Sequence, residues 1–232
     1  MVPVEEWSSG RGSCGLIQLS LPSNNSSPLN ILCLGAHSDD IEIGCGGTVL
    51  RLAEQYPGCV FYWVVFSAIE VRDAEARRAA TLFVSANNLK GPLLKAFPDG
   101  FMPFVGADVK LVFEELKKEV SPELIFTHNR MDAHQDHRLI SELTWNTFRN
   151  HLILEYEIPK YDGDMGQPNV FVPLELELAQ KKVAYIMDTF HSQHGKPWFQ
   201  ADTFRSLLRL RGMECNAPSG NAEAFYCRKL VL

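Results

Sequence analysis

The sequence predicts an α/β protein in which helices cover both faces of a mostly parallel central sheet. Three observations predict this class. Short apolar runs rich in β-branched and aromatic residues alternate with longer segments that favour helix. The chain has 232 residues, 46% hydrophobic and 22% charged, which is typical of a globular domain that buries a core. Two of the apolar runs end in clusters of polar residues, at the point where parallel sheets bind ligands.

Residues 1–30 are predicted to form an N-terminal extension, and residues 31–232 a single domain. Within the extension, residues 16–21 alternate between apolar and polar side chains, a pattern typical of an edge strand. Residues 21–28 are rich in Pro, Ser and Asn and predict a loop. Residues 1–15 carry two glutamates and no apolar core, so we expect no secretory signal and a cytoplasmic protein.

Seven segments carry the predicted secondary structure of the domain. Three apolar runs predict buried strands, at residues 31–35, 60–66 and 124–127. Helical period or helix-favouring composition predicts four helices, at residues 47–55, 72–83, 109–120 and 138–148. Residues 157–172 contain two prolines and two glycines and predict a long loop, of a length typical of functional lids or partner surfaces.

The composition argues against several classes of protein. The 28 acidic and 22 basic residues give a net charge of −6, so the overall charge does not attract nucleic acid or an anionic membrane. No apolar stretch approaches the ~20 residues of a membrane-spanning helix. The six cysteines include no CxxC pair, which argues against a thiolate metal cluster and favours reduced, buried thiols. A homo-oligomer is compatible with all of these observations.

The first polar cluster, Ala36–Asp40, directly follows the predicted strand 31–35. His37 and Asp40 lie three residues apart, so a tight turn or a helix start can direct both at one point. Imidazole nitrogen and carboxylate oxygen are ligands that zinc accepts. Asp39 lies between them and is free to act as a general base. Two adjacent aspartates repel each other, and a divalent cation is a strong means of offsetting that repulsion.

The second cluster, His128–His137, directly follows the predicted strand 124–127. One member of the pair His134 and His137 can supply a third metal ligand and leave a fourth position open, which is the layout of a catalytic site. The other can lie beside a substrate carbonyl and stabilise the developing oxyanion. Asp136 can hold a neighbouring histidine in one orientation.

Each cluster alone has an ordinary structural interpretation. An Asp-Asp pair before a helix is often an N-cap with a favourable charge, and a His-rich loop is often solvated surface. Their occurrence together, at successive strand ends of one parallel sheet, favours a metal site over these two interpretations.

The clusters resemble the motifs of the LmbE/PIG-L-type zinc deacetylases. The run His37–Gly47 (HSDDIEIGCGG) is similar to the opening motif of that family. The run His134–His137 (HQDH) is similar to its His-x-Asp-His loop. A third match, Lys182–Gln193, resembles a late helix of the family and ends in His-Ser-Gln. The resemblance spans residues 31 to about 200, with the three motifs in the family's order.

The first motif departs from the usual His-Pro-Asp-Asp-Glu, because Ser38 replaces the proline and Ile41 the glutamate. The His, Asp and Asp residues are intact. The resemblance implies a Rossmann-like three-layer fold and one zinc ion, or another divalent metal ion in its place. It also implies hydrolysis of N-acyl groups, mostly N-acetyl, on small amino-sugar conjugates.

By matching position, the resemblance implies that His37, Asp40 and His137 are the metal ligands. It implies that Asp39 is the general base, and that His134 is the general acid or the group that stabilises the oxyanion. On this hypothesis Asp39 takes a proton from the attacking water, and the acyl oxygen gains its charge beside His134.

Three further polar residues are candidates for substrate binding. Arg72 follows the strand 60–66, and Asp99 lies in a Pro-Asp-Gly sequence; the corresponding family positions resemble sugar-hydroxyl contacts. A salt bridge to Glu70 or Glu75 explains Arg72 equally well, and a turn explains Asp99 equally well. His191 can line the pocket, although a structural histidine is the more ordinary role.

Two other functions compete with hydrolysis. A non-catalytic metal- or sugar-binding module would be favoured if Asp39 or a ligand were missing, and all of these residues are present. A Rossmann-type nucleotide-sugar-binding domain would carry Gly-x-Gly-x-x-Gly after its first strand. The run Gly44–Gly47 instead comes after the aspartates and lacks that spacing.

Overall fold

The computed structural model of the protein describes residues 19, 21 and 28–231. Its strands are β1 (Asn30–His37), β2 (Val60–Ser67), β3 (Leu89–Leu94), β4 (Leu124–His128), β5 (Leu152–Tyr156), β6 (Val170–Pro173) and β7 (Ala222–Cys227). Its α-helices are α1 (Asp40–Gln55), α2 (Val71–Phe83), α3 (Gly106–Glu119), α4 (Gln135–Thr147), α5 (Leu176–Thr189) and α6 (Ala201–Glu214). Two short 3-10 helices are η1 (Met102–Val105) and η2 (His191–Gln193).

The described strands form one seven-stranded sheet in the order β3-β2-β1-β4-β5-β7-β6. The five strands from β3 to β5 run parallel to one another. At the other edge, β7 runs antiparallel to both β5 and β6. The predicted α/β class with a mostly parallel sheet is therefore confirmed, and the antiparallel strands are confined to one edge.

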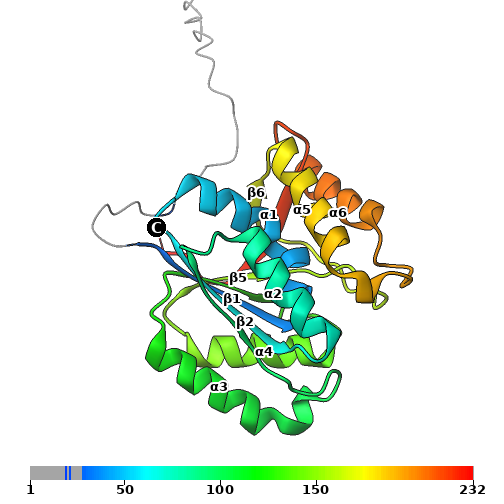
Figure 1. The fold of residues 1–232 in the computed structure, drawn as a ribbon. Coiled ribbons are helices and arrows are strands. Elements are labelled where there is room, and N and C mark those ends of the chain that lie inside the picture. Colours follow the sequence, from blue (N-terminus) through cyan, green and yellow to red (C-terminus); the bar gives the residue numbers. More distant parts are fainter. Residues whose placement is uncertain (1–18, 20, 22–27, 232) are drawn as a thin grey trace, which may run out of the picture.

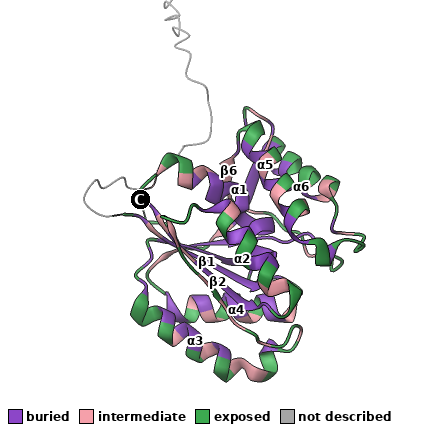
Figure 2. Ribbon diagram, in the orientation of Figure 1, coloured by how far each residue is buried: buried purple, intermediate pink, exposed green. Residues whose placement is uncertain are grey.

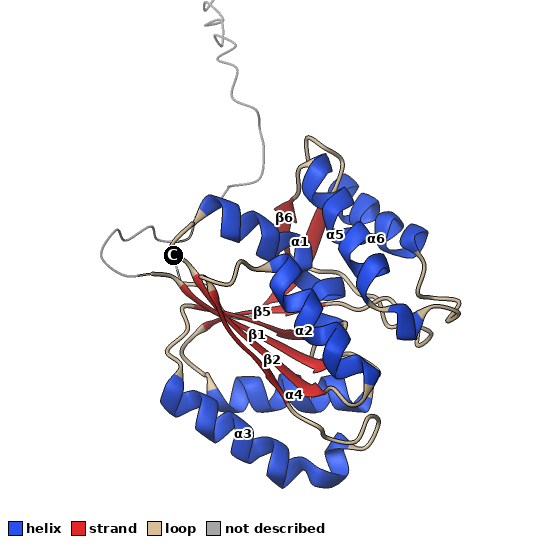
Figure 3. Ribbon diagram, viewed as in Figure 1, coloured by secondary structure: helices blue, strands red, loops and turns tan. Residues whose placement is uncertain are grey.

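Helices cover both faces of the sheet (Figure 1). Each face has its own apolar core. One core packs Ile31 and Trp63 of the sheet against α1, α2, α5 and α6. The other packs Leu32 and Phe66 against α3 and α4. Successive residues of a strand point to opposite faces, so a strand covered on both sides is apolar throughout. The central strands are accordingly buried (Figure 2), and the layers of helix, sheet and helix are visible in Figure 3.

Helix α1 begins at Asp40, well before the helix predicted at residues 47–55. Three glycines within residues 44–47 lower the local helix propensity, so the sequence pattern indicates helix only further along. Tertiary packing explains these glycines. A Cβ atom on Gly44 would lie 2.2 Å from the ring of Tyr156 in β5. The absence of side chains therefore lets α1 approach the sheet closely.

Several elements differ from the prediction or were missed by it. The sequence pattern did not indicate β3, which contains Gly91-Pro92, or β5, β6, β7 and α6. Residues 157–169 form the predicted long loop without helix or strand, but residues 170–172 belong to β6. That short strand is defined by its pairing with β7, far along the chain, which no local pattern can reveal. The edge strand expected over residues 16–21 falls outside the described residues, apart from Leu19 and Leu21.

The two polar clusters meet where the connectivity of the sheet reverses. Strands β1 and β4 are neighbours, but α1 covers one face of the sheet and α4 the other. Parallel sheets bind ligands in the crevice beyond such a point. Since β1 ends at His37 and β4 ends at His128, both clusters lie at that edge of the sheet, beside the point of reversal. Among the described residues, no helix has the length and apolar character needed to span a membrane.

Candidate metal centre

The first cluster is held at the junction of β1 and α1. His37 is the last residue of β1, and its backbone N–H donates to Asp40 Oδ2 at 2.6 Å, which closes the turn before the helix. Asp40 is the first residue of α1 and is only 3% exposed. Its carboxylate therefore lies at the positive end of the helix dipole, where negative charge is favoured.

The second cluster is held by the loop between β4 and α4. His134 is the N-cap residue of α4, and its Nδ1 accepts a hydrogen bond from the backbone N–H of Asp136 at 3.2 Å. His137 is buried in the first turn of α4, with Nδ1 2.9 Å from Asp132 Oδ2. The carboxylate of Asp132 fixes the imidazole ring of His137 and leaves Nε2 directed at the first cluster.

The three predicted ligands converge on one point. His37 Nδ1 lies 3.3 Å from Asp40 Oδ2 and 3.2 Å from His137 Nε2. His137 Nε2 lies 3.5 Å from Asp40 Oδ1. Ligands held tetrahedrally at about 2.0–2.1 Å from a zinc ion are about 3.3 Å from one another. The three side chains therefore lie within a few ångströms of one another, with His37 close to Asp40 Oδ2 and His137 close to Asp40 Oδ1, and their donor atoms suit a divalent cation.

Further potential ligand atoms lie close to these three residues. Three groups of side chains each bring their ligand atoms within 4.8 Å of one another: His37, His134 and His137; His37, Asp99, His134 and Asp136; and Asp40, His128 and His137. Every group contains His37 or His137. The carboxyl edge of the sheet thus forms a candidate divalent-metal site centred on these histidines.

Burial and neighbouring charges shift the pKa values of the side chains in the cluster. Burial disfavours the ionised form of Asp40, yet the imidazoles of His137, His128 and His37 hold the pKa of that carboxyl well below its ordinary value. Burial, followed by the charge of His128, holds the pKa of His137 below its ordinary value. Burial also opposes the charged form of His37, but Asp40 and other carboxylates raise its pKa well above the ordinary value. A cation and a proton therefore compete for the ring nitrogens of His37.

Asp39 lies at the start of α1, beside the ligands but outside their groupings. Its Oδ1 is 2.5 Å from Arg72 Nη2, in the first turn of α2. Within the described chain, only Oδ1 of the Asp39 carboxylate accepts a hydrogen bond, so Oδ2 has no partner in the protein. Arg72 is thus brought to the site, and it pairs with neither Glu70 nor Glu75.

Two further carboxylates contact His37. Asp136 Oδ2 lies 3.2 Å from His37 Nε2 and accepts the backbone N–H of Gly100 at 2.7 Å. Asp136 therefore contacts a histidine of the first cluster, and its carboxylate is held by the backbone N–H groups of Gly100 and Met102. Asp99 Oδ1 lies 3.0 Å from His37 Nε2, and this contact lowers the pKa of Asp99 to about 2. Both predicted residues are thus brought to the centre.

Asp132 is a site residue that the sequence reasoning missed. It is 3% exposed, and it contacts His137 through Oδ2 and the backbone N–H of His134 through Oδ1, at 2.7 Å. Its only signal in the sequence is that it is another carboxylate in a polar loop. His128 is fully buried beside it in the fold, where its Nε2 lies 2.9 Å from the backbone N of Ala36 and 3.2 Å from Asp40 Oδ2.

The structure does not bring His191 to the centre. His191 is an exposed residue of η2, and within the described chain it makes no contact with the ligand cluster. The next residue, Ser192, donates its backbone N–H and its hydroxyl to Glu75 at 2.8 and 2.6 Å. The His-Ser-Gln end of the third motif therefore fastens the chain after α5 to α2. The geometry gives no support to a pocket-lining role for His191.

The two departures from the first motif are both buried. Ser38 donates its hydroxyl to the backbone carbonyl of Ser67 at 3.4 Å, across the ends of β1 and β2. Ile41 packs in the core between α1 and the sheet. With both replacements present, His37 ends β1, Asp39 precedes α1 and Asp40 begins α1.

Comparison with known proteins gives one family match. The model of the PIG-L family, described as GlcNAc-PI de-N-acetylase, matches residues 32–148, about half of the chain. A similar curated protein is the uncharacterized deacetylase YaiS of Escherichia coli K12. It is 26% identical over 184 residues, which cover 73% of this chain and 95% of YaiS.

Solved structures share the fold at low identity. The conserved protein TT1542 from Thermus thermophilus superposes with a TM-score of 0.71 at 20% identity, over 88% of this chain and 96% of its own. The N,N'-diacetylchitobiose deacetylase of Pyrococcus horikoshii gives 0.64 at 18% identity, over 85% and 83%. GalB of Pseudomonas putida KT2440, a 4-carboxy-2-hydroxymuconate hydratase, gives 0.67 at 18% identity, over 88% and 98%. The last of these indicates that the fold alone does not decide the reaction.

Proposed function

Since the chain belongs to the PIG-L (GlcNAc-PI de-N-acetylase) family, we propose that it is a divalent-metal-dependent hydrolase that removes an N-acetyl group from a small amino-sugar conjugate. One observation carries the proposal. His37 Nδ1 and His137 Nε2 lie 3.2 Å apart, and each lies 3.3 to 3.5 Å from one of the two carboxylate oxygens of Asp40, beside Asp39. Zinc is the proposed ion, because imidazole and carboxylate ligands with an open fourth position are typical of catalytic zinc sites.

In this proposal His37, Asp40 and His137 hold the ion. A divalent cation bound there polarises the acyl oxygen and makes nearby water more acidic. The remaining parts of the reaction belong to the side chains of the protein.

Asp39 acts as the general base. Its free Oδ2 takes a proton from the attacking water, while Arg72 holds Oδ1 at 2.5 Å and fixes the orientation of the carboxylate. The water oxygen bonds to the acyl carbon, the C–N bond breaks, and Asp39 returns the proton to the leaving amine. The first products are acetic acid and the neutral amine, and transfer of the acid proton to the amine gives acetate and an ammonium group, so atoms and charges balance.

His134 stabilises the acyl oxygen as that oxygen becomes negative. Because its Nδ1 accepts a hydrogen bond from the backbone of Asp136, the ring proton is on Nε2 and is available for donation. Burial lowers the pKa of His134, which favours the neutral ring near neutral pH. Of the two roles that the family resemblance implies for His134, these observations favour stabilisation of the oxyanion.

The nucleotide-sugar-binding alternative is weakened by the position of the glycines. Gly44–Gly47 lie within α1 and are buried against neighbouring elements, so they do not form a phosphate-binding loop. The non-catalytic alternative predicts metal binding without turnover. An activity measurement therefore separates it from hydrolysis.

The test is acetate release by the full chain from a panel of N-acetylglucosamine conjugates. We expect activity with bound Zn²⁺, loss of activity after chelation, and recovery when the ion is restored. Asp39→Asn should lower kcat by about 10²-fold or more with the metal content unchanged, because the base is lost while the ligands remain. Asp73→Asn, which changes a partly exposed carboxylate on α2 that pairs with Arg77, is the matched control. Absence of acetate from every conjugate, or full activity in Asp39→Asn, would contradict the proposal.

A further inference from the structure

We propose that Lys160 is a positioning residue for the metal centre, and that it couples the loop of residues 157–169 to metal binding. The inference rests on the proposed function, because it takes His137 as a metal ligand. Lys160 lies in that loop, far along the chain from both polar clusters. No sequence motif pointed to it.

Lys160 makes a buried ionic contact with the loop that carries His137. Its side chain is 9% exposed, and its Nζ lies 3.0 Å from Asp132 Oδ1. The other oxygen of Asp132 lies 2.9 Å from His137 Nδ1. A continuous series of polar contacts therefore runs from Lys160 through Asp132 to the His137 ring, whose Nε2 faces His37 and Asp40.

Asp164 reinforces this connection from the same loop. Its Oδ2 lies 2.5 Å from Lys160 Nζ and accepts the backbone N–H of Ala133 at 2.7 Å. Two residues of the 157–169 loop thus hold adjacent residues, Asp132 and Ala133, of the metal-bearing loop. This arrangement restrains both the side chain that orients His137 and the backbone beside it.

The positive charge of Lys160 is needed in this arrangement. The carboxylates of Asp132 and Asp164 approach one ammonium group, and both are largely buried, at 3% and 12% side-chain exposure. Removing one partner of a buried charge pair leaves the other charge without compensation. An uncharged side chain at position 160 would therefore leave Asp132 without its cation and loosen its hold on His137.

The far side of the loop is tied to the scaffold. Arg211 of α6 contacts both carboxylate oxygens of Glu157, at 2.7 and 2.9 Å, and donates to the carbonyl of Gly166 at 3.0 Å. Lys160 and Asp164 lie between these two anchored residues. Because Glu157 and Gly166 are held by Arg211, the loop cannot move as a whole when Asp132 moves. A displacement of Asp132 would therefore strain the contacts of Lys160 and Asp164.

Coupling of this kind is reciprocal. If the ordered loop increases the affinity of the site for the metal, then a bound metal must stabilise the ordered loop by the same coupling free energy. We therefore expect zinc to protect residues 157–169 from hydrogen exchange. This protection separates a positioning role from a merely structural one, because it requires the connection through Lys160.

The experiment compares Lys160→Met and Lys160→Arg with the unchanged chain. Zinc affinity is measured by competition with a chelator, and the visible spectrum of the Co²⁺-loaded protein reports the ligand geometry. We expect Lys160→Met to weaken zinc binding by about 10- to 100-fold, to alter the Co²⁺ spectrum and to abolish the zinc-dependent protection of residues 157–169. Lys160→Arg keeps the charge and should restore most of the affinity.

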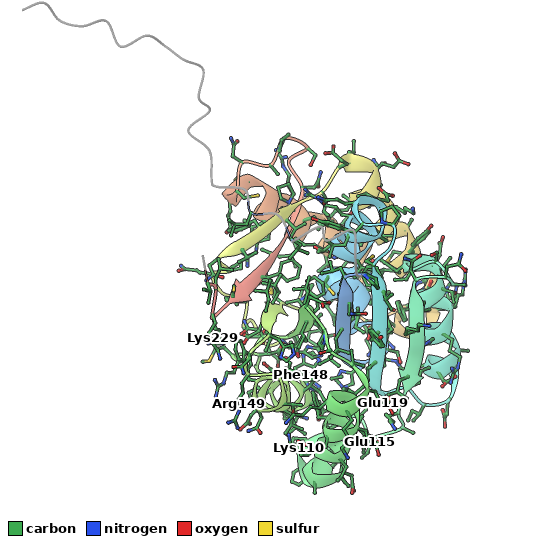
Figure 4. The ribbon with its side chains drawn as sticks, turned by 90° about the vertical axis from the view of Figure 1, so that its left-hand side faces the viewer. Lys110, Glu115, Glu119, Phe148, Arg149 and Lys229 are labelled. Atoms are coloured by element: carbon green, nitrogen blue, oxygen red, sulfur yellow. The ribbon has the colours of Figure 1, made fainter. Side chains whose placement is uncertain are left out.

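A matched control is Lys110→Met. Lys110, on α3 (labelled in Figure 4), contacts Glu114 at 2.7 Å and Thr147 at 2.9 Å, and it should leave zinc affinity unchanged when substituted. Asp164→Asn gives a second route if Lys160→Met does not fold, with an expected smaller loss of affinity. Variants at 160 or 164 that match the unchanged chain in zinc affinity and in loop protection would overturn this inference and leave the proposed function intact. Failure of the unchanged chain to bind any divalent metal overturns the proposed function as well.

Discussion

Single residues at the centre owe their ionisation to groups that come from distant parts of the chain. Burial opposes the charged form of Asp40, Asp132 and Asp136, yet contacts with histidines keep the pKa of all three below the ordinary value. The pKa of Asp99 falls to about 2 because of its contact with His37. These carboxylates therefore remain ionised in the folded protein at pH values where they are protonated in the unfolded chain.

This difference predicts the acid sensitivity of the metal-free protein. The stability that a carboxylate with a lowered pKa contributes is present above the ordinary value of 3.8 and is lost as pH falls through the folded-state value, about 2 for Asp99. We expect the free energy of unfolding, measured by urea titration, to fall from about pH 4 to about pH 2. Asp99→Asn removes one of the responsible groups and should make the decline shallower. A decline of equal slope in both proteins would refute this assignment.

Among the elements, α1 shows most clearly how packing overrides local preference. Its glycines are poor helix formers, but each allows a neighbour to approach closely. The ring of Tyr156 lies against Gly44, and the Tyr156 hydroxyl donates to the carbonyl of Leu34 at 2.6 Å. The hydroxyl also lies 3.2 Å from His128 Nε2. Tyr156 thus connects the packing of α1 on β5 to a hydrogen bond with His128 at the candidate metal centre.

Gly44→Ala is expected to destabilise the fold although alanine is the better helix former. Alanine gains roughly 0.5–1 kcal/mol of helical preference over glycine. The added Cβ would lie 2.2 Å from a buried ring that hydrogen bonds hold in position, and such overpacking costs about 1–3 kcal/mol. Urea unfolding should therefore show a net loss. Gly58→Ala is the control, because no atom lies within 4 Å of its added Cβ. Increased stability in Gly44→Ala would contradict this prediction, because it would mean that the Tyr156 ring moves away from the added Cβ at little cost.

In the whole molecule, the residues that follow the family match at 32–148 are joined to the matched residues by buried polar contacts. Lys182 of α5 donates to the carbonyl of Ile43 in α1 at 2.6 Å and contacts Glu223 of β7 at the same distance. Glu223 in turn accepts the backbone N–H groups of Gly47 and Thr48, at 2.8 and 2.6 Å. One buried ion pair thereby joins α1, α5 and β7, and the antiparallel edge of the sheet supports the helix that begins at Asp40.

Removal of one charge from this pair should destabilise the whole molecule. Lys182→Met leaves Glu223 buried without a cation, which costs about 3–5 kcal/mol in comparable cases. The double variant Lys182→Met/Glu223→Gln removes both charges and should recover part of that loss. Thermal and urea unfolding measure both effects. A loss of less than about 1 kcal/mol in the single variant would mean that the pair adds little to the stability of the fold.

Features that depend on residues close together in the chain could be predicted from the sequence. The apolar runs identified β1, β2 and β4, because a strand covered on both faces must be apolar throughout. The polar residues after β1 and β4 indicated a metal site, because His37 and Asp40 share one turn and His134 and His137 share another. Parallel strands bring their carboxyl ends to one edge, so the two clusters were expected to meet.

Only the tertiary structure decided which groups contact one another across the sheet. Asp132 as the partner of His137, Arg72 as the partner of Asp39, and Lys160 as the partner of Asp132 all depend on how loops pack after folding. The antiparallel strands β6 and β7 depend on the same long-range pairing. A sequence pattern reports the propensity of a short segment, whereas these contacts depend on positions that the rest of the chain imposes.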